Sequence, residues 1–155
     1  MRVGHIQQII GPVVDVAFPL ENGQPNIHDA LIVVRHEDFD TETDIKEINL
    51  DNSITLEVAL DIGGGIVRSI AMESTEGLRR GMKVIDTSRP ISVPVGEITL
   101  GRVFNVLGQT IDEKGPITEE HVVKSIHRDA PRYEDLSSNY EVLETGIKVI
   151  DLLAP

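Results

Sequence analysis

The chain has 155 residues, of which 40% are hydrophobic, and its formal net charge is −12. This apolar content excludes a wholly disordered chain, and the acidic charge disfavours nucleic acid and anionic membrane surfaces as direct partners. The absence of cysteine excludes disulfides and thiolate metal sites and agrees with a cytosolic setting. No run approaches the roughly 18 apolar residues of a membrane span, and the first residues lack a signal peptide, so we expect a soluble protein.

Short apolar stretches separated by turn signals fill the first half of the chain. The stretches 3–10 and 13–18 flank Gly11-Pro12, and Val14, Val16 and Phe18 fall on one face of the second stretch. Residues 31–34 form a continuous apolar run, which is typical of a buried strand.

The clearest strand signal lies at residues 54–62. Apolar residues alternate there with polar or small ones, a period of two that predicts a half-buried strand. The alternating apolar residues are Ile54, Leu56, Val58, Leu60 and Ile62. Gly63-Gly64-Gly65 then supplies a turn into residues 66–72, which predicts a β-hairpin. Strands at this spacing are typical of a small closed barrel or a sandwich, and we assign residues 1–80 to this unit.

The pattern changes at a boundary that we place at Gly77–Gly81. Thr99 can cap a helix that Gly108 ends, with helically spaced apolar residues at positions 100, 103, 104 and 107. Residues 112–116 predict a turn, and Thr145 opens a short helix through residues 147–153. Apolar positions such as Ile147, Val149 and Leu152 would be short of partners there. We therefore expect residues 81–155 to be less well packed than residues 1–80, unless a neighbouring chain covers them.

No phosphate-binding or calcium-binding motif in the sequence is complete. Gly63-Gly64-Gly65 fails the dinucleotide pattern at Arg68, and no Gly-Lys-Ser/Thr phosphate-loop sequence occurs anywhere in the chain. The acidic stretch 37–47 lacks the glycine and the glutamate of a calcium loop, at Thr43 and Asn49, so we interpret it as a solvated loop.

The histidines show no metal-ligand spacing. His36-Glu37 begins a zinc-protease pattern, but Asp40 stands where the second histidine is required. Surface or turn roles explain the five histidines better, at positions 5, 28, 36, 121 and 127. No nucleophile elbow is present, and Glu119-Glu120 and Glu134-Asp135 are expected on solvated loops. We therefore assign no catalytic, cofactor-binding or metal-binding residue within residues 1–155.

Several blocks of the sequence resemble the catalytic and non-catalytic subunits of rotary ATPases. Residues 11–16 (GPVVDV) are similar to the opening strand pair of these subunits, and residues 67–72 (VRSIAM) with 77–81 (GLRRG) to the end of their N-terminal barrel. The remaining blocks follow in the family's order: 94–96 (PVG), 99–102 (TLGR), 105–108 (NVLG), 111–112 (ID), 126–131 (IHRDAP) and 145–155 (TGIKVIDLLAP). Gln109-Thr110 departs from the family, which more often has a proline there.

Within the family, two features resemble the β (catalytic) subunit of F-type ATP synthase rather than its α subunit. They are Met72 after Ile70-Ala71, and the sequence Asp-Leu-Leu-Ala-Pro at residues 151–155. The resemblance implies a mainly β fold, with a six-stranded β-barrel in residues 1–80. Residues 81–155 would be the incomplete start of an α/β nucleotide-binding domain, truncated before the phosphate loop.

The same resemblance implies cofactors, partners and location. The phosphate loop and the catalytic residues would lie beyond Pro155, so Mg-ATP/ADP would bind the intact parent protein and not bind this chain tightly. The expected partners are ATP synthase α subunits in an alternating hexameric ring and the central-stalk γ subunit. The complex would be peripheral on the cytoplasmic side of the energy-transducing membrane, in bacteria the cell membrane, or on the organelle equivalent.

Two hypotheses about function follow. The leading one is a fragment of the catalytic subunit of the proton-translocating F-type ATP synthase, whose barrel serves assembly and which is inactive alone. The alternative is a standalone, non-catalytic, oligomerising β-barrel module; vacuolar-type and flagellar export ATPase subunits fit the quoted blocks less well. Both predict weak or no MgATP binding by the isolated chain, and only the first predicts tight binding when the chain is extended past Pro155.

Overall fold

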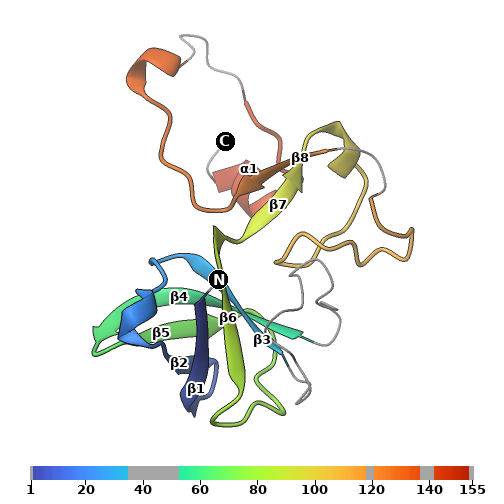
Figure 1. The fold of residues 1–155 in the computed structure, drawn as a ribbon. Coiled ribbons are helices and arrows are strands. Elements are labelled where there is room, and N and C mark those ends of the chain that lie inside the picture. Colours follow the sequence, from blue (N-terminus) through green and yellow to red (C-terminus); the bar gives the residue numbers. More distant parts are fainter. Residues whose placement is uncertain (1, 35–52, 118–120, 137–141, 154–155) are drawn as a thin grey trace.

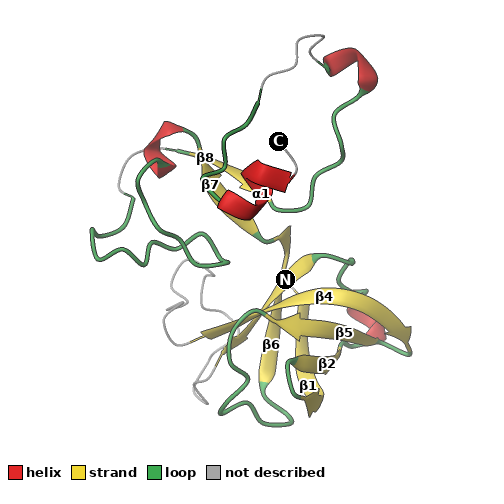
Figure 2. Ribbon diagram, turned by 180° about the vertical axis from the view of Figure 1, so that it is seen from behind, coloured by secondary structure: helices red, strands yellow, loops and turns green. Residues whose placement is uncertain are grey.

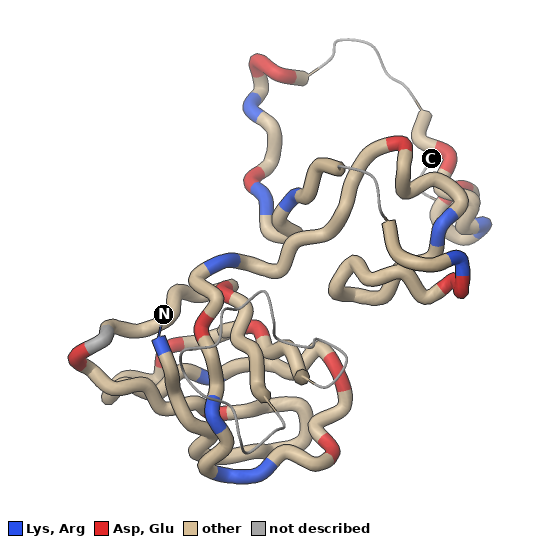
Figure 3. The backbone as a smooth tube through the Cα atoms, turned by 45° about the vertical axis from the view of Figure 1, so that its right-hand side comes forward, with Lys and Arg blue, Asp and Glu red and all other residues tan. Residues whose placement is uncertain are grey.

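A closed β-barrel and a less regular second part follow one another along the chain (Figures 1 and 2). The computed structural model describes residues 2–34, 53–117, 121–136 and 142–153. Acidic and basic residues are spread over both parts of the described chain (Figure 3).

Six antiparallel strands form the barrel, in the order β1-β2-β5-β4-β3-β6. Their bounds are β1 (Arg2–Ile10), β2 (Val13–Ala17), β3 (Asp29–Val34), β4 (Ser53–Gly63), β5 (Ile66–Ala71) and β6 (Lys83–Pro90), with a 3-10 turn at Leu20–Asn22. Strand β6 pairs with β1 on one side and with β3 on the other, which closes the barrel and leaves no free edge. The predicted mainly β fold with a six-stranded barrel is confirmed.

Aliphatic side chains fill the barrel interior, as the scarcity of aromatic residues requires. Val14 and Val16 are fully buried and Phe18 is 4% exposed, so the predicted inward face of β2 is confirmed. The apolar run of β3 is also buried, with Leu31 and Val33 at 0% exposure. The buried cluster comprises Ile6, Val14, Val16, Phe18, Leu31, Val33, Ile54, Leu56, Val58, Val67 and Val84.

Strands β4 and β5 form the predicted hairpin, and Gly64 and Gly65 make its turn. The expectation that Leu60 and Ile62 share the buried face of β4 is wrong, because these side chains are 52% and 47% exposed. The pairing of β4 with β5 shifts register between Val58 and Leu60 and again near the turn. Such bulges bend a strand, so the outer end of β4 leaves the core.

Two glycines allow the chain to approach itself closely around Phe18. A Cβ atom at Gly4 would lie 2.7 Å from the Ala17 carbonyl oxygen and 2.9 Å from the Phe18 ring. A Cβ atom at Gly65 would lie 2.6 Å from the Phe18 carbonyl oxygen, and Gly65 has a φ of 84°. Only glycine fits these two positions without a shift of the backbone.

The barrel extends to Pro90, so its predicted end near residue 80 is wrong. Gly77 and Gly81 belong to a turn within the barrel and not to a linker between domains. The Gly81 N–H donates to the Ile6 carbonyl at 2.8 Å, and the Ile6 N–H donates to the Met82 carbonyl at 2.9 Å. These bonds return the chain toward β1, and β6 then closes the sheet.

The described residues of the second part form a small two-stranded sheet, 3-10 turns and a short helix. Strands β7 (Ser92–Val95) and β8 (Val122–Ser125) pair antiparallel, and 3-10 turns lie at Glu97–Thr99 and Tyr133–Asp135. Helix α1 spans Lys148–Leu153. No described residue after Ile91 is buried, which agrees with the expected weaker packing of this region.

The predicted helix over residues 99–108 is absent, and a tight turn of extended chain takes its place. Phe104 forms a β-bridge with Thr110, and the Asn105 side-chain oxygen accepts the N–H groups of Leu107 and Gln109 at 3.0 and 2.9 Å. A side-chain acceptor that captures backbone donors competes directly with a helix. Gly101, with a φ of 69°, also leaves the helical region.

The predicted helix after Thr145 is confirmed, although it begins at Lys148. The Asp151 carboxylate accepts the Thr145 hydroxyl at 2.6 Å and the Gly146 N–H at 2.9 Å. The Thr145 hydroxyl bond and the backbone bonds hold the pKa of Asp151 below its usual value. Thr145 therefore organises the start of the helix through Asp151.

Candidate functional site

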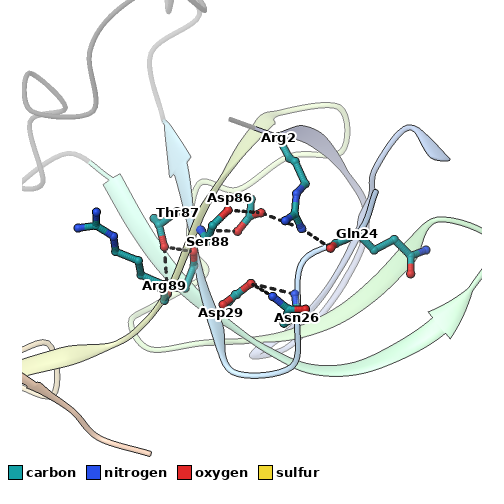
Figure 4. Close-up of polar contacts among 9 residues, drawn as sticks. Arg2, Gln24, Asn26, Asp29, Asp86, Thr87, Ser88 and Arg89 are labelled. Atoms are coloured by element: carbon teal, nitrogen blue, oxygen red, sulfur yellow. Dashed lines mark hydrogen bonds and ion pairs between the residues drawn. The ribbon is translucent and has the colours of Figure 1, made fainter. Parts of the chain in front are cut away.

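A buried carboxylate joins the first and last strands of the barrel (Figure 4). Asp86 on β6 is 1% exposed and is the register partner of Arg2 on β1. Arg2 Nη1 lies 3.3 Å from Asp86 Oδ2, and the same guanidinium donates to the Gln24 carbonyl. The Ser88 N–H and hydroxyl donate to the two Asp86 oxygens at 2.8 and 3.1 Å. These partners satisfy the buried charge of Asp86, and the contact with Arg2 joins β6 to β1 where the barrel closes.

Further polar contacts hold the neighbouring strand ends (Figure 4). The Thr87 hydroxyl donates to the Ala30 carbonyl at 2.7 Å, which ties β6 to β3. The Asp29 carboxylate accepts the Asn26 N–H at 2.8 Å, which fixes the turn before β3. These bonds serve the fold, and none of them joins a nucleophile to a base.

Asp15 on β2 and Arg68 on β5 form a two-pronged ion pair. Arg68 donates to the two carboxylate oxygens over 2.8 and 2.9 Å, and the two residues are register partners. The hydrogen bond from Arg68 holds the pKa of Asp15 below its usual value, and burial opposes this shift. Asp15 is 6% exposed, so its carboxylate is largely covered, and the pair links β2 to β5.

Among the described residues of the second part are a similar ion pair and a shallow depression. Arg102 donates to Asp112 over 2.6 and 3.0 Å, which holds the pKa of that carboxyl far below its usual range. A depression of about 310 Å³ lies nearby, lined by Val93, Pro94, Thr99, Phe104, Asn105 and Gly108. Its lining carries no titratable side chain, so it offers no acid–base chemistry.

Three side chains that are distant in sequence meet between the barrel and the second part. Glu57 lies on β4, His28 precedes β3, and His127 follows β8. Glu57 Oε1 lies 3.8 Å from His28 Nδ1, and Glu57 Oε2 lies 2.9 Å from His127 Nε2. The two imidazole rings stack with centroids 3.8 Å apart. One donor atom from each residue lies within 4.8 Å of the other two, which is an arrangement that can hold a metal ion.

The spacing of residues in the sequence did not predict this cluster of His28, Glu57 and His127. The histidines were expected to have surface or turn roles, but the fold brings two of the five together with a carboxylate. The separation of Glu57 and His127 is 70 residues, so no local motif signals it. Glu134-Asp135 lies on an exposed 3-10 turn as expected. The acidic stretch 37–47, His36-Glu37 and Glu119-Glu120 lie outside the described residues.

The fold and these contacts define a closed antiparallel β-barrel domain whose buried carboxylates are paired with arginines on neighbouring strands. The model of the ATP synthase alpha/beta family, β-barrel domain, matches residues 6–88. The match begins in β1 and ends within β6, so it spans all six barrel strands. The chain therefore belongs to the ATP synthase alpha/beta family and carries its N-terminal β-barrel domain. This is the family of rotary ATPase subunits, which assemble in a hexamer and act as hydrolases in the intact complex.

In the part of the chain that the structure describes, none of the helices has the length and the apolar sequence that a membrane span requires.

Proposed function

We propose that this chain is the front part of the catalytic β subunit of F-type ATP synthase, and that its barrel serves subunit assembly. The observation that carries the proposal is the family match over the whole closed barrel. The choice of β over α rests on the resemblance at Met72 and at residues 151–155. Residues after the barrel would then belong to the start of a nucleotide-binding domain.

The barrel surface supports a role in assembly. Ile10 and Ile70 are 55% and 43% exposed, and Val13 is the register partner of both. They form an apolar patch across β1, β2 and β5 on a barrel that has no free edge. We infer that this surface contacts a neighbouring subunit, because exposed apolar surface is where protein–protein interfaces form when it is contiguous. In the proposed assembly the neighbours are α subunits in an alternating ring, with the γ subunit in the central stalk.

In the proposed parent enzyme, hydrolysis transfers the γ-phosphoryl group of ATP to water, which gives ADP and phosphate. Synthesis is the reverse reaction, in which ADP and phosphate form ATP and release water. Such sites use Mg²⁺ and a phosphate loop to hold the phosphates while a carboxylate positions the water. The printed sequence contains no phosphate-loop sequence. Accordingly, the 155-residue chain binds MgATP weakly or not at all, and catalysis belongs to the intact subunit on the cytoplasmic side of an energy-transducing membrane.

The assembly proposal is tested by mixing the chain with an ATP synthase α subunit and measuring the mass of the product by native mass spectrometry. We expect a mixed oligomer, which Ile70→Asp weakens. The matched control is Tyr133→Asp, because Tyr133 is 90% exposed on the second part. Formation of an oligomer that contains only this chain, with no uptake of α, would favour the standalone module instead.

MgATP titration gives an independent test of the catalytic part of the proposal. The chain is compared with a version that continues past Pro155 to include the nucleotide-binding domain. Tight binding only in the extended version is the expected result. Weak binding by both versions would contradict the assignment to a catalytic subunit.

A further inference from the structure

We propose that His28, Glu57 and His127 form a binding site for a first-row divalent metal ion, with Zn²⁺ as the reference ion. The site lies between the barrel and the second part of the chain, and it is independent of the nucleotide chemistry proposed above. A bound ion would connect the two parts directly.

The donor types define the class of ion. Two imidazole nitrogens and one carboxylate oxygen are a ligand set that Zn²⁺ uses in proteins, with a fourth position left for water. Imidazole nitrogen suits Zn²⁺, Ni²⁺ and Cu²⁺, whereas Mg²⁺ and Ca²⁺ require oxygen ligands. The site is therefore selective against the magnesium that accompanies ATP.

The distances allow one ion to bind with small side-chain movements. Zinc bonds to nitrogen and oxygen are roughly 2.0–2.2 Å long, so tetrahedral donors lie about 3.3 Å apart. The donor atoms here lie within 4.8 Å of one another, and Glu57 Oε2 and His127 Nε2 are already 2.9 Å apart. Rotation of the His28 ring about its side-chain bonds brings the third donor inward.

Backbone hydrogen bonds hold two of the three ligands in position. Glu57 pairs with Ala30 in the β3–β4 ladder, and the His28 N–H donates to the Val58 carbonyl at 2.8 Å. His28 has a φ of 75°, a left-handed conformation that is uncommon for residues other than glycine. That conformation, held by the ladder, brings the His28 ring to the Glu57 carboxylate.

The third ligand comes from the second part of the chain but is anchored close to the barrel. The Ile126 N–H donates to the carbonyl of Ile91, which directly follows β6 and is 5% exposed. The His127 N–H donates to the Ser125 hydroxyl at 3.1 Å. An ion held by all three ligands would therefore fasten the segment after β8 to β4.

Exposure permits an ion to enter and leave. The side chains of His28 and His127 are 50% and 37% exposed, whereas that of Glu57 is 15% exposed. The carboxylate is thus the fixed base of the site, and the two rings form its open side. With a chain charge of −12, cations are also attracted electrostatically.

Calorimetric titration of the untagged 155-residue chain with Zn²⁺ tests the site. We expect one tightly bound ion per chain. His28→Gln, Glu57→Gln and His127→Gln should each weaken binding by at least about 100-fold, since even outer-shell partners of a metal cost roughly 10–100-fold. The matched control is His5→Gln, because His5 is exposed on β1 outside the cluster and its loss should leave binding unchanged.

Two further measurements distinguish specific binding at the three proposed ligands from nonspecific binding of ions to the acidic surface. Co²⁺ should give the visible absorption bands of a four-coordinate ion with the parent chain and lose them with His127→Gln. Zn²⁺ should slow hydrogen exchange in residues 121–127 of the parent chain. Circular dichroism checks that each variant is folded, and His127→Gln leaves the barrel sequence intact.

Several outcomes would overturn the proposal. They are the absence of Zn²⁺ binding, equal binding by the parent chain and all three ligand variants, and a loss of binding in only one of the two histidine variants. Equal binding by all variants would show that the acidic surface holds the ion, and the cluster would then be an ion pair only. None of these outcomes bears on assembly with α subunits.

Discussion

Asp15 and Arg68 face each other across β2 and β5 as register partners, and two hydrogen bonds of 2.8 and 2.9 Å join their charged groups. Asp15 is nearly buried, whereas the Arg68 side chain is 43% exposed. The buried carboxylate therefore needs the guanidinium as a hydrogen-bond partner, whereas the exposed guanidinium can also bind water. Removal of the Asp15 charge should therefore lower stability more at neutral pH than in acid, where the carboxyl is protonated.

We predict that Asp15→Asn lowers stability at neutral pH and flattens its dependence on pH in acid. The pKa of Asp15 is lowered in the folded state, mainly by the Arg68 hydrogen bond. Its contribution is thus fully present above the unfolded carboxyl pKa, about 3.9, and is lost as pH falls through the lower folded pKa. Urea unfolding at neutral pH and at about pH 3 measures the difference. Glu73→Gln, at an exposed position, is the control, and an unchanged acid slope in Asp15→Asn would contradict the assignment.

The two ends of β4 should respond differently to the same substitution. Leu56 is fully buried, so Leu56→Ala should lower the free energy of unfolding by about 2–5 kcal/mol. Leu60 is 52% exposed beyond the register shift, so Leu60→Ala should change it by less than about 0.5 kcal/mol. Denaturant unfolding of both variants gives the comparison. Similar losses would mean that the outer end of β4 is packed.

The sequence predicted strand β4 and the turn after it because both depend on residues that are close in sequence. The alternation from Ile54 to Val58 and the glycine turn after β4 depend on residues close in sequence, and both are confirmed. The sequence pattern could not show at which residue of β4 the apolar side chains become exposed, because the bulge near Leu60 arises from pairing with β5. The register of a strand depends on the strand with which it pairs, so the sequence of β4 alone does not predict a register shift.

Closure of the barrel and the histidine cluster both depend on distant residues. Strand β6 is a barrel strand because it pairs with β1 and β3, and the glycines before it resembled a domain boundary. His28, Glu57 and His127 have no common spacing, and only the folded chain brings them together. The predicted helix near Thr99 failed for a different reason, since the Asn105 side chain competes for the backbone donors of that segment.

Removal of one buried hydroxyl should stabilise the barrel. Ser69 on β5 is fully buried, and its Oγ has no hydrogen-bond partner among the described residues. A buried unpaired hydroxyl costs roughly 1–3 kcal/mol, so Ser69→Ala should raise the free energy of unfolding by about 1 kcal/mol. Thermal and urea unfolding report the change. Ser92→Ala, at an exposed position on β7, serves as the control, and a loss of stability in Ser69→Ala would show that the hydroxyl has a partner.

Hydrogen exchange should divide the described chain at Ile91. The ladder amides of β3, β4 and β6 surround the buried cluster and should exchange only through global or near-global unfolding. No described residue beyond Ile91 is buried, so amides of residues 97–117 and 142–153 should exchange much faster. Within residues 97–117, the Asn105–Gln109 turn should be the slowest segment, because backbone and side-chain bonds both close it. Mass spectrometry of peptides from an exchange time course measures all three classes.

Equal protection on both sides of Ile91 in the isolated chain would contradict the packing difference. Protection that appears beyond Ile91 only when α subunits are added would locate the covering surface on a neighbouring subunit.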